Sequence, residues 1–226
     1  MDIMVELERA GAVLLNRHFV YKSGKHGSGY INLDTIFPNV GVVSDLCADL
    51  IAPFLGVTET GDTETGGVDT VAAPAVGGIV LSVLAGCAFR DAGRSVSAIW
   101  ADKNGDDFAF ERAGFTDQLR GKRVLVVEDL LTTGGSVAKV CRQAERHGAE
   151  IVGVSVVCNR GGVTASQLGV ARLEALTSVS FTAVDPGTCS LCVAGTPIVD
   201  DIGHGGAYKA EHPTYKGGYI SVSTTA

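Results

Sequence analysis

Residues 124–136 constrain the fold of this 226-residue chain more than any other stretch, because they join an apolar run, an acidic pair and a glycine turn. The run consists of Val124, Leu125, Val126 and Val127. Consecutive aliphatic residues are typical of a strand that is covered on both faces, as in the middle of a parallel sheet. The stretch therefore predicts a strand, a loop and a following helix inside an α/β domain.

The loop after this strand has the composition of a phosphate-binding site. Hydroxyl groups come from Thr132, Thr133 and Ser136, while Gly134 and Gly135 allow backbone amides to come close to a ligand. The helix that follows would point the positive end of its dipole at the same place. We therefore predict that a phosphate group binds in this loop.

Glu128 and Asp129 stand between the apolar run and this loop. Carboxylates in that position can accept hydrogen bonds from sugar hydroxyls or hold a hydrated Mg2+ through oxygen ligands. The alternative is a strand, turn and helix without a ligand, but an acidic pair facing a hydroxyl-rich glycine turn has no packing purpose. The Gly-Lys-Ser/Thr of a Walker-type loop and the Gly-x-Gly-x-x-Gly of a dinucleotide loop are both missing from the sequence.

From Thr70 onward, strand-like and helix-like segments alternate, which predicts an α/β fold: a parallel sheet with helices on both faces. The expected strands cover residues 70–73, 96–100, 123–127, 151–157 and 173–178. The expected helices cover residues 42–55, 79–90 and the segment that follows the glycine turn and ends at a cap on Gly148.

Upstream of this core we expect a short helix that ends near Asn16 and a small hood, formed by a hairpin within residues 19–34. Residues 58–69 are typical of an exposed loop, and the chain beyond Pro186 is interpreted as lacking regular elements. These expectations divide the chain into a helix and hood (1–40), an α/β core (41–185) and a C-terminal, loop-like extension (186–226).

Parallel sheets bind ligands beyond the carboxyl ends of their strands, so the loops after the predicted strands should converge. The turn at Ala75, Val76 and Gly77 could present backbone amides to a diphosphate, or it could be a tight turn without a ligand. Arg160 ends the fourth strand, where its planar fork suits a carboxylate. A surface arginine that pairs with a nearby acid is the alternative.

Two lysines are further candidates. Lys22 precedes the hairpin turn and could reach the same cleft, although a lone lysine is more often solvated. Lys103 lies within the charged residues 101–114, with Gly105 as a pivot. This segment is either a mobile loop that closes over the site or a solvent-exposed hairpin.

The acidic pair with its Thr-Thr-Gly-Gly-Ser run resembles the signature with which type I phosphoribosyltransferases bind 5-phosphoribosyl 1-diphosphate (PRPP). More of the chain resembles orotate phosphoribosyltransferases in particular. Residues 19–34 are similar to that family's N-terminal signature, with Lys22 at its substrate-contacting lysine. The Pro-Ala-x-Gly-Gly-Ile turn and the Asn-Arg-Gly-Gly run follow in the family's order, and residues 185–197 resemble a C-terminal block of one branch.

The resemblance implies the type I phosphoribosyltransferase fold and transfer of the 5-phosphoribosyl group of PRPP to orotate, giving orotidine 5'-monophosphate and diphosphate. One alternative is a purine or another base as the acceptor. The other is a PRPP-sensing protein without turnover, which a lid shorter and more acidic than usual for the family would favour. The resemblance also implies Mg2+ as cofactor, held mainly by PRPP, and a homodimer, because the family's lid commonly reaches into the neighbouring subunit.

The same resemblance assigns residue roles. Catalytic roles fall on Lys103, Glu128 and Asp129, and contacts with orotate fall on Lys22, Thr132 and Arg160. The PRPP-binding positions lie in the two glycine turns and the charged loop: Ala75, Val76, Gly77, Lys103, Glu128, Asp129, Leu130, Leu131, Thr132, Thr133, Gly134, Gly135 and Ser136.

Composition narrows the range of partners. A net charge of -7 without a basic run argues against nucleic acid, because phosphate backbones need clustered Lys and Arg. No apolar run approaches the ~20 residues that a membrane span needs. The N-terminus lacks the basic-then-apolar pattern of a signal peptide. We therefore expect a cytoplasmic protein with no nucleic-acid or membrane partner.

The six cysteines fall into two groups. The apolar segments contain Cys47, Cys87, Cys141 and Cys158, which we interpret as buried free thiols. The other two, Cys189 and Cys192, form a Cys-x-x-Cys pair in a predicted loop. A four-thiolate zinc site would need a second such pair, and a redox pair would normally open a helix after a strand. We interpret the pair as structural, with metal binding as the less favoured alternative.

Overall fold

The computed structural model describes residues 3–56 and 67–222. The chain divides into two compact units. One, the sheet unit, contains Ile36–Val179 and the first residues Met1–Ile3. The other, the terminal unit, joins Met4–Thr35 to Ser180–Ala226. The N-terminal hood and the C-terminal segment, separate in the sequence-based division, thus belong to the same unit.

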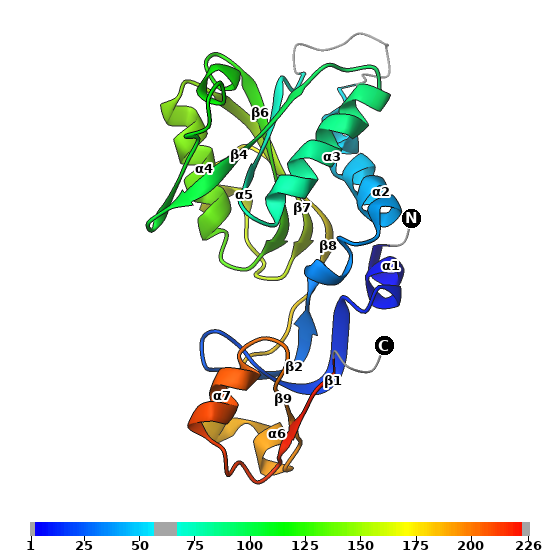
Figure 1. Ribbon diagram of the computed structural model, residues 1–226, viewed down its shortest axis with the longest axis vertical. Helices are drawn as coiled ribbons and strands as arrows, with labels where there is room; N and C mark the ends of the chain where they lie inside the picture. Colours follow the sequence, from blue (N-terminus) through cyan, green and yellow to red (C-terminus); the bar gives the residue numbers. More distant parts are fainter. Residues whose placement is uncertain (1–2, 57–66, 223–226) are drawn as a thin grey trace. The chain divides into compact units, whose positions relative to one another are not determined.

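The sheet unit is built on six strands in the order β5-β4-β3-β6-β7-β8 (Figure 1). All neighbouring pairs are parallel except β4 with β5. The strands are β3 (Thr70–Pro74), β4 (Ser97–Asn104), β5 (Asp107–Ala109), β6 (Arg123–Leu131), β7 (Glu150–Asn159) and β8 (Leu173–Ser178). The prediction of an α/β fold with a mostly parallel sheet is confirmed.

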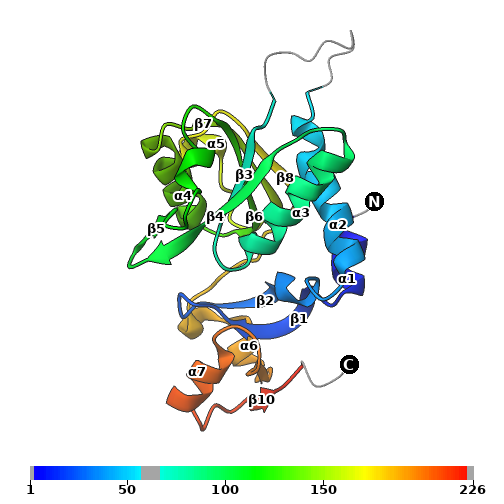
Figure 2. The same ribbon diagram turned by 45° about the horizontal axis from the view of Figure 1, so that its top comes forward.

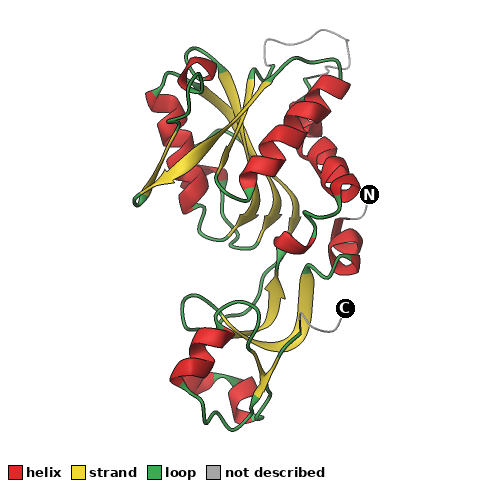
Figure 3. Ribbon diagram, viewed as in Figure 1, coloured by secondary structure: helices red, strands yellow, loops and turns green. Residues whose placement is uncertain are grey.

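Helices cover both faces of this sheet (Figure 3). On one face, α2 (Val40–Ile51) packs near β7 and β8, and α3 (Gly78–Asp91) packs near β3, β4 and β6. On the other face lies α4 (Gly135–Arg146), with the short α5 (Ala165–Leu168) beside it. Single 3-10 turns occur at η2 (Ala52–Phe54) and η3 (Thr116–Gln118).

The apolar run of β6 explains why it occupies the middle of the sheet. Val124 and Val126 belong to the hydrophobic cluster that includes Val140 of α4. Leu125 and Val127 are fully buried and lie outside that cluster. Because successive side chains of a strand point to opposite faces, four aliphatic residues in a row require cover on both sides.

The predicted loop at residues 101–114 is partly regular. Strand β4 continues to Asn104 and pairs with β5, so the segment forms a hairpin, and Figure 2 shows it beside α4. Of the predicted exposed loop at residues 58–69, the part up to residue 66 lies outside the described residues. Among the helices that are described, none is long and apolar enough to cross a membrane.

The terminal unit contains a sheet of four short strands in the order β10-β9-β1-β2. The predicted hairpin is confirmed: β1 (Val13–Val20) and β2 (His26–Ile31) pair antiparallel. The remaining elements are α1 (Ile3–Arg9), η1 (Leu33–Thr35), η4 (Pro186–Thr188), α6 (Ser190–Val193), β9 (Ile198–Val199), α7 (Gly205–Glu211) and β10 (Tyr219–Ile220).

Two sequence-based expectations are wrong in this unit. The first helix ends at Arg9 rather than near Asn16, because the chain reverses at Gly11, where φ is 68°, and then enters β1. Between Pro186 and Val222, the last residue described, the chain contains two helices and two strands, although no regular element was expected there. A strand of two residues has no periodicity that a sequence could reveal. Here β9 forms by pairing with β1, and β10 forms by pairing with β9.

Candidate functional site

The predicted phosphate loop lies between β6 and α4. Its residues 132–136, called the cradle below, connect Leu131 at the end of β6 to the first turn of α4. Gly134 precedes the helix in a left-handed conformation with φ 73°, which glycine adopts at little cost. The loop encloses a hollow of about 60 Å³, lined by Glu128, Leu130, Leu131, Thr132, Thr133, Gly134, Gly135, Ser136 and Val137.

Glu128 of the acidic pair lines this hollow, and Asp129 follows it on β6. The Asp129 amide donates to Oε1 of Glu128 at 3.1 Å, and the Leu130 amide donates to Oδ1 of Asp129 at 2.6 Å. Burial, and then the negative charge of Asp129, raises the pKa of Glu128 well above its ordinary value. A carboxyl in this state is stabilised by a proton, a cation or hydroxyl donors from a ligand.

The second glycine turn lies directly beside the acidic pair. A Cβ added at Gly77 would lie 3.3 Å from Oδ2 of Asp129, and one added at Gly78 would lie 2.8 Å from Cβ of Ala73. Glycine therefore allows the backbone at Ala75 and Val76 to run close to the carboxylates, just before α3 begins. The Ala75–Val76 peptide bond is cis. The structure thus brings the two predicted glycine turns together.

The loop that carries Arg160 packs against the cradle. The amides of Arg160 and Gly161 both donate to the Leu131 carbonyl, at 2.9 and 3.0 Å. The side chain of Asn159 closes the loop by donating to and accepting from the backbone of Val163, at 2.8 and 3.0 Å. Arg160 is half-buried at the carboxyl end of β7, next to the point where β6 meets the cradle.

Gly161 is a positioning residue that sequence reasoning missed. A Cβ there would lie 1.6 Å from the carbonyl oxygen of Thr132, so only glycine permits this contact between the two loops. The signal was present in the Asn-Arg-Gly-Gly run, in which we gave a role to the arginine alone.

Lys103 belongs to the β4–β5 hairpin. It is exposed on β4 opposite Phe108. The hairpin tip is tied to α4, because Gln143 donates to Asp107 at 3.0 Å and Lys139 donates to the Asp106 carbonyl. Among residues 3–56 and 67–222, no hydrogen bond or ion pair joins the Lys103 side chain to the cradle. Its contact with PRPP stays a prediction.

Lys22 belongs to the terminal unit. It is exposed in the turn between β1 and β2, where the Gly24 amide donates to the Tyr21 carbonyl at 2.9 Å and Gly24 has φ 77°. The side chain of Lys22 is exposed to solvent, and its contact with a substrate stays a prediction.

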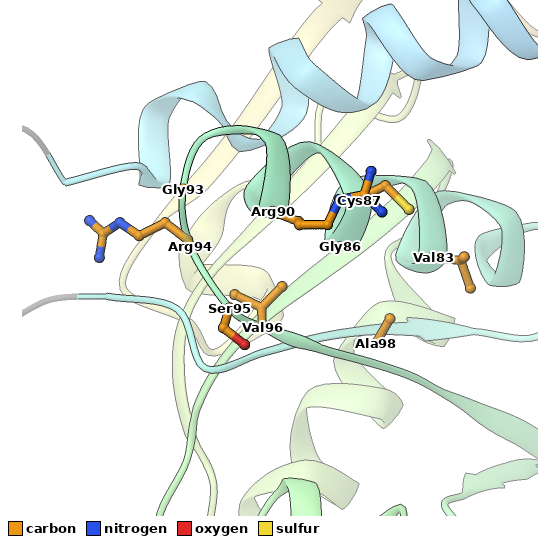
Figure 4. Close-up of a pocket in the computed structure, with 9 residues that line it drawn as sticks. All are labelled: Val83, Gly86, Cys87, Arg90, Gly93, Arg94, Ser95, Val96 and Ala98. Carbon is orange, nitrogen blue, oxygen red and sulfur yellow. The ribbon is translucent and has the colours of Figure 1, made fainter.

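A larger hollow of about 620 Å³ lies elsewhere in the sheet unit (Figure 4). Val83, Cys87 and Arg90 of α3 line it, together with Val96, which precedes β4, and Ala98 of β4. Ligands of parallel sheets bind at the carboxyl ends of the strands, and the lining of this hollow contains no carboxylate. The chemistry therefore points to the smaller hollow at the cradle.

Comparisons with known proteins agree with this geometry. A model of the phosphoribosyl transferase domain matches residues 62–170, which contain both glycine turns and the acidic pair. The orotate phosphoribosyltransferase of Desulforamulus reducens is 36% identical over 200 residues, covering 88% of this chain and 94% of that protein.

Solved structures show the same fold. A crystal structure of orotate phosphoribosyltransferase from Aeropyrum pernix has a TM-score of 0.55 at 23% identity and covers 79% of this chain and 94% of that one. The Mycobacterium tuberculosis enzyme in complex with PRPP also has a TM-score of 0.55, at 20% identity, and covers 79% of this chain and 97% of that one. Because it is 36% identical to the D. reducens protein over 88% of its length, the chain belongs to the orotate phosphoribosyltransferase family.

Proposed function

We propose that this enzyme, a glycosyltransferase by its family, transfers the 5-phosphoribosyl group of PRPP to orotate, releasing diphosphate. The observation that carries the proposal is the convergence of three loops on the carboxyl end of β6, the strand that carries the acidic pair. The cradle, the turn at Ala75–Gly77 and the Arg160 loop all lie against the end of β6. Phosphate, diphosphate and carboxylate groups each have a matching partner in this arrangement.

The cradle would hold the 5-phosphate of PRPP. Hydroxyl groups of Thr133 and Ser136 and the backbone amides at the start of α4 surround a hollow of about 60 Å³, a suitable size for a small anionic group. Glu128 and Asp129 would accept hydrogen bonds from the ribose hydroxyls. Donation from these hydroxyls would relieve the cost of ionising Glu128, whose pKa is raised by burial and by Asp129.

Orotate would lie between the cradle and Arg160. The guanidinium would pair with the carboxylate of orotate, and Thr132 would bond to the edge of the ring. Lys22 would contact the same substrate from the hairpin of the terminal unit. The negative charge of orotate lies on its carboxylate, whereas its ring nitrogen still carries a proton that must leave when the new bond forms.

In the reaction, the bond between C1 of the ribose and the diphosphate oxygen breaks, and a bond from C1 to the ring nitrogen forms. The proton of that nitrogen passes to the departing diphosphate. The electron pair of the broken bond leaves with diphosphate, and positive charge builds on the ribose ring. Lys103 and the backbone amides at Ala75–Gly77 would stabilise the leaving diphosphate. The acidic pair would stabilise the developing positive charge.

Mg2+ fits this site, since Glu128 and Asp129 supply the oxygen donors that it prefers. When bound, mainly through PRPP, it would neutralise charge on the diphosphate. We expect the enzyme to work in the cytoplasm, because its proposed substrates are anionic metabolites.

We also propose a homodimer, in which the β4–β5 hairpin serves the partner's site. The hairpin projects beside α4 and leaves Lys103 exposed, as a lid that acts on a second copy would require. In addition, Val80 and Val83 of α3 are exposed at helical spacing. Size-exclusion chromatography with light scattering should give twice the mass of the chain, and a monomer at micromolar concentration would contradict the proposed homodimer.

The test of the activity is the loss of orotate absorbance after PRPP is added with Mg2+. Uracil, xanthine and hypoxanthine serve as parallel acceptors, and diphosphate release is measured for each. Turnover with orotate alone supports the proposal. Turnover with another base identifies a different acceptor, and PRPP binding without diphosphate release from any base at about 1 mM identifies a sensor instead of an enzyme.

A further inference from the structure

Four side chains that the proposed reaction does not use meet inside the terminal unit. His18 lies on β1, His26 begins β2, Cys189 caps α6 and Cys192 lies within α6. One ligand atom from each of them lies within 4.8 Å of the other three. We call these residues the His-Cys cluster. His18, His26 and Cys189 are buried, and Cys192 is half-buried.

The hairpin and the loop that follows η4 bring these residues together. His26 lies opposite Val20 in the β1–β2 register, and its backbone also bridges to Val184, which anchors the chain ahead of Cys189. His18 pairs with Ile198 on the other edge of β1. The cluster is therefore fixed by backbone hydrogen bonds on both sides.

The distances fit a tetrahedral ion with two nitrogen and two sulfur ligands. Zinc bonds of about 2.0–2.1 Å to nitrogen and about 2.3 Å to sulfur separate ligand atoms by roughly 3.3 Å for two nitrogens and roughly 3.6 Å for nitrogen and sulfur. Nε2 of His18 lies 2.9 Å from Nδ1 of His26, 3.6 Å from Sγ of Cys189 and 3.7 Å from Sγ of Cys192. Sγ of Cys192 lies 3.2 Å from Nδ1 of His26.

Hydrogen bonding directs a lone pair of His18 into the cluster. Nδ1 of His18 lies 2.9 Å from the Thr196 carbonyl, which can only accept, so this nitrogen carries the proton in the neutral ring. Nε2 then presents its lone pair to the other three residues. Imidazoles that bind metals are oriented in the same way, by donation from the nitrogen that does not bind the metal.

His26 directs its Nδ1 into the cluster. This atom lies 2.9 Å from Nε2 of His18 and 3.2 Å from Sγ of Cys192. An ion at the centre would use Nδ1 of His26, Nε2 of His18 and both sulfurs, leaving Nε2 of His26 to carry the ring proton.

We propose that His18, His26, Cys189 and Cys192 bind one Zn2+ ion as a closed structural site. Two thiolates and two imidazoles in a tetrahedral arrangement favour zinc over the harder ions Mg2+ and Ca2+. All four positions are filled by side chains, which is typical of a structural rather than a catalytic zinc. The site is separate from the cradle, and its test needs no turnover.

Strands β9 and β10 of the terminal unit are two residues long. Small units are commonly stabilised by metals or disulfides. The ion would tie the N-terminal hairpin to the C-terminal segment, two parts of the chain that no short loop connects.

The first experiment measures the metal in tag-free protein that was purified under reducing conditions without chelators. We expect about one zinc per chain in the wild type and at least a tenfold lower content in Cys192→Ser and His26→Asn. Cys87→Ser is the matched control, because Cys87 is a half-buried thiol of α3 outside the cluster. It should keep the full zinc content.

The second experiment covers the possibility that a variant fails to fold. Wild-type protein stripped of metal is titrated with Co2+, which should give visible absorption bands of a tetrahedral site and charge-transfer bands from thiolate, saturating at about one equivalent. Zinc should also raise the melting temperature of the stripped wild type, whereas magnesium should not. Alkylation mapped by mass spectrometry should find Cys189 and Cys192 protected until zinc is removed.

Three outcomes would overturn the proposal. The reduced wild type could contain less than about a tenth of a zinc per chain and show no tetrahedral Co2+ spectrum. Cys192→Ser could bind as much zinc as Cys87→Ser. Cys189 and Cys192 could be joined as a disulfide in protein taken directly from cells, which would make the pair a covalent link instead of a ligand pair.

Discussion

Gly161→Ala tests how the Arg160 loop positions the cradle, because the added methyl group would meet backbone rather than a movable side chain. The new Cβ would lie 1.6 Å from the Thr132 carbonyl oxygen and 2.6 Å from the carbonyl carbon. Such contacts are essentially never shorter than 3.0 Å, so one of the two loops must move by about 1.4 Å. The φ of Gly161 lies outside the left-handed region, so alanine adds no dihedral strain of its own.

The movement breaks the hydrogen bonds from the Arg160 and Gly161 amides to the Leu131 carbonyl. Each backbone bond contributes about 0.5–1.5 kcal/mol, so we expect the free energy of unfolding to fall by roughly 1–3 kcal/mol. The effect on turnover should be larger, because a displacement of about 1 Å in a positioning loop can lower rates ~100-fold. Initial rates with PRPP and orotate give kcat/KM, and urea unfolding gives the stability.

Gly121→Ala is the matched control. Gly121 has φ 66° and open space around its Cβ position, and it precedes β6 at the end opposite to the cradle. Alanine there should cost about 1–2 kcal/mol of stability through the left-handed conformation and leave kcat/KM unchanged. Wild-type kcat/KM in Gly161→Ala, or an equal loss in both variants, would refute the idea that this glycine contact positions the cradle.

Three further changes separate the roles of the other residues. Arg160→Ala should weaken orotate binding by roughly 2–4 kcal/mol and leave PRPP binding intact, and calorimetry with each ligand would show the difference. Glu128→Gln should raise the free energy of unfolding at neutral pH, because the folded protein raises the pKa of Glu128 and so resists its ionisation. This gain should be full above the folded-state pKa and fade as the pH falls toward the ordinary value of 4.5, and urea unfolding across that range would reveal it. The same variant should bind PRPP more weakly. Lys103→Ala should lower kcat roughly a hundredfold but change the stability by less than about 0.5 kcal/mol, since the side chain is exposed; equal losses in both would show a structural role instead.

The sheet unit could be predicted because its signals are local. The apolar run of β6, the acidic pair and the glycine turn are contiguous in sequence, and each part has a direct physical consequence for the next. The contact between Gly161 and Thr132 is different, since it depends on how far β6 and β7 extend beside one another. Sequence reasoning ended β6 at Val127, four residues before its actual end at Leu131.

The His-Cys cluster could not be predicted from spacing alone. A search for zinc sites by cysteine spacing looks for a second pair of thiols, whereas the other two ligands here are histidines. His18 precedes Cys189 by 171 residues, and His26 precedes Cys192 by 166 residues. They meet the cysteines only because the terminal unit joins both ends of the chain. The Cys-x-x-Cys pair was placed in a loop, but Cys189 in fact precedes α6 and Cys192 lies within it.

The hairpin of the terminal unit links the two proposals. Lys22 lies in the turn between β1 and β2, and His18 and His26 lie on the strands at either side of that turn. An ion that binds both histidines would hold the two strands in register and thereby fix the turn that presents Lys22. Removal of zinc should therefore raise the KM for orotate, which Lys22 is proposed to contact, and leave the affinity for PRPP unchanged, because the cradle belongs to the sheet unit. Lys22→Ala is the reference, since in this variant the removal of zinc should no longer alter the KM for orotate. An equal loss of PRPP affinity on zinc removal would show that the ion supports the whole chain and not the hairpin.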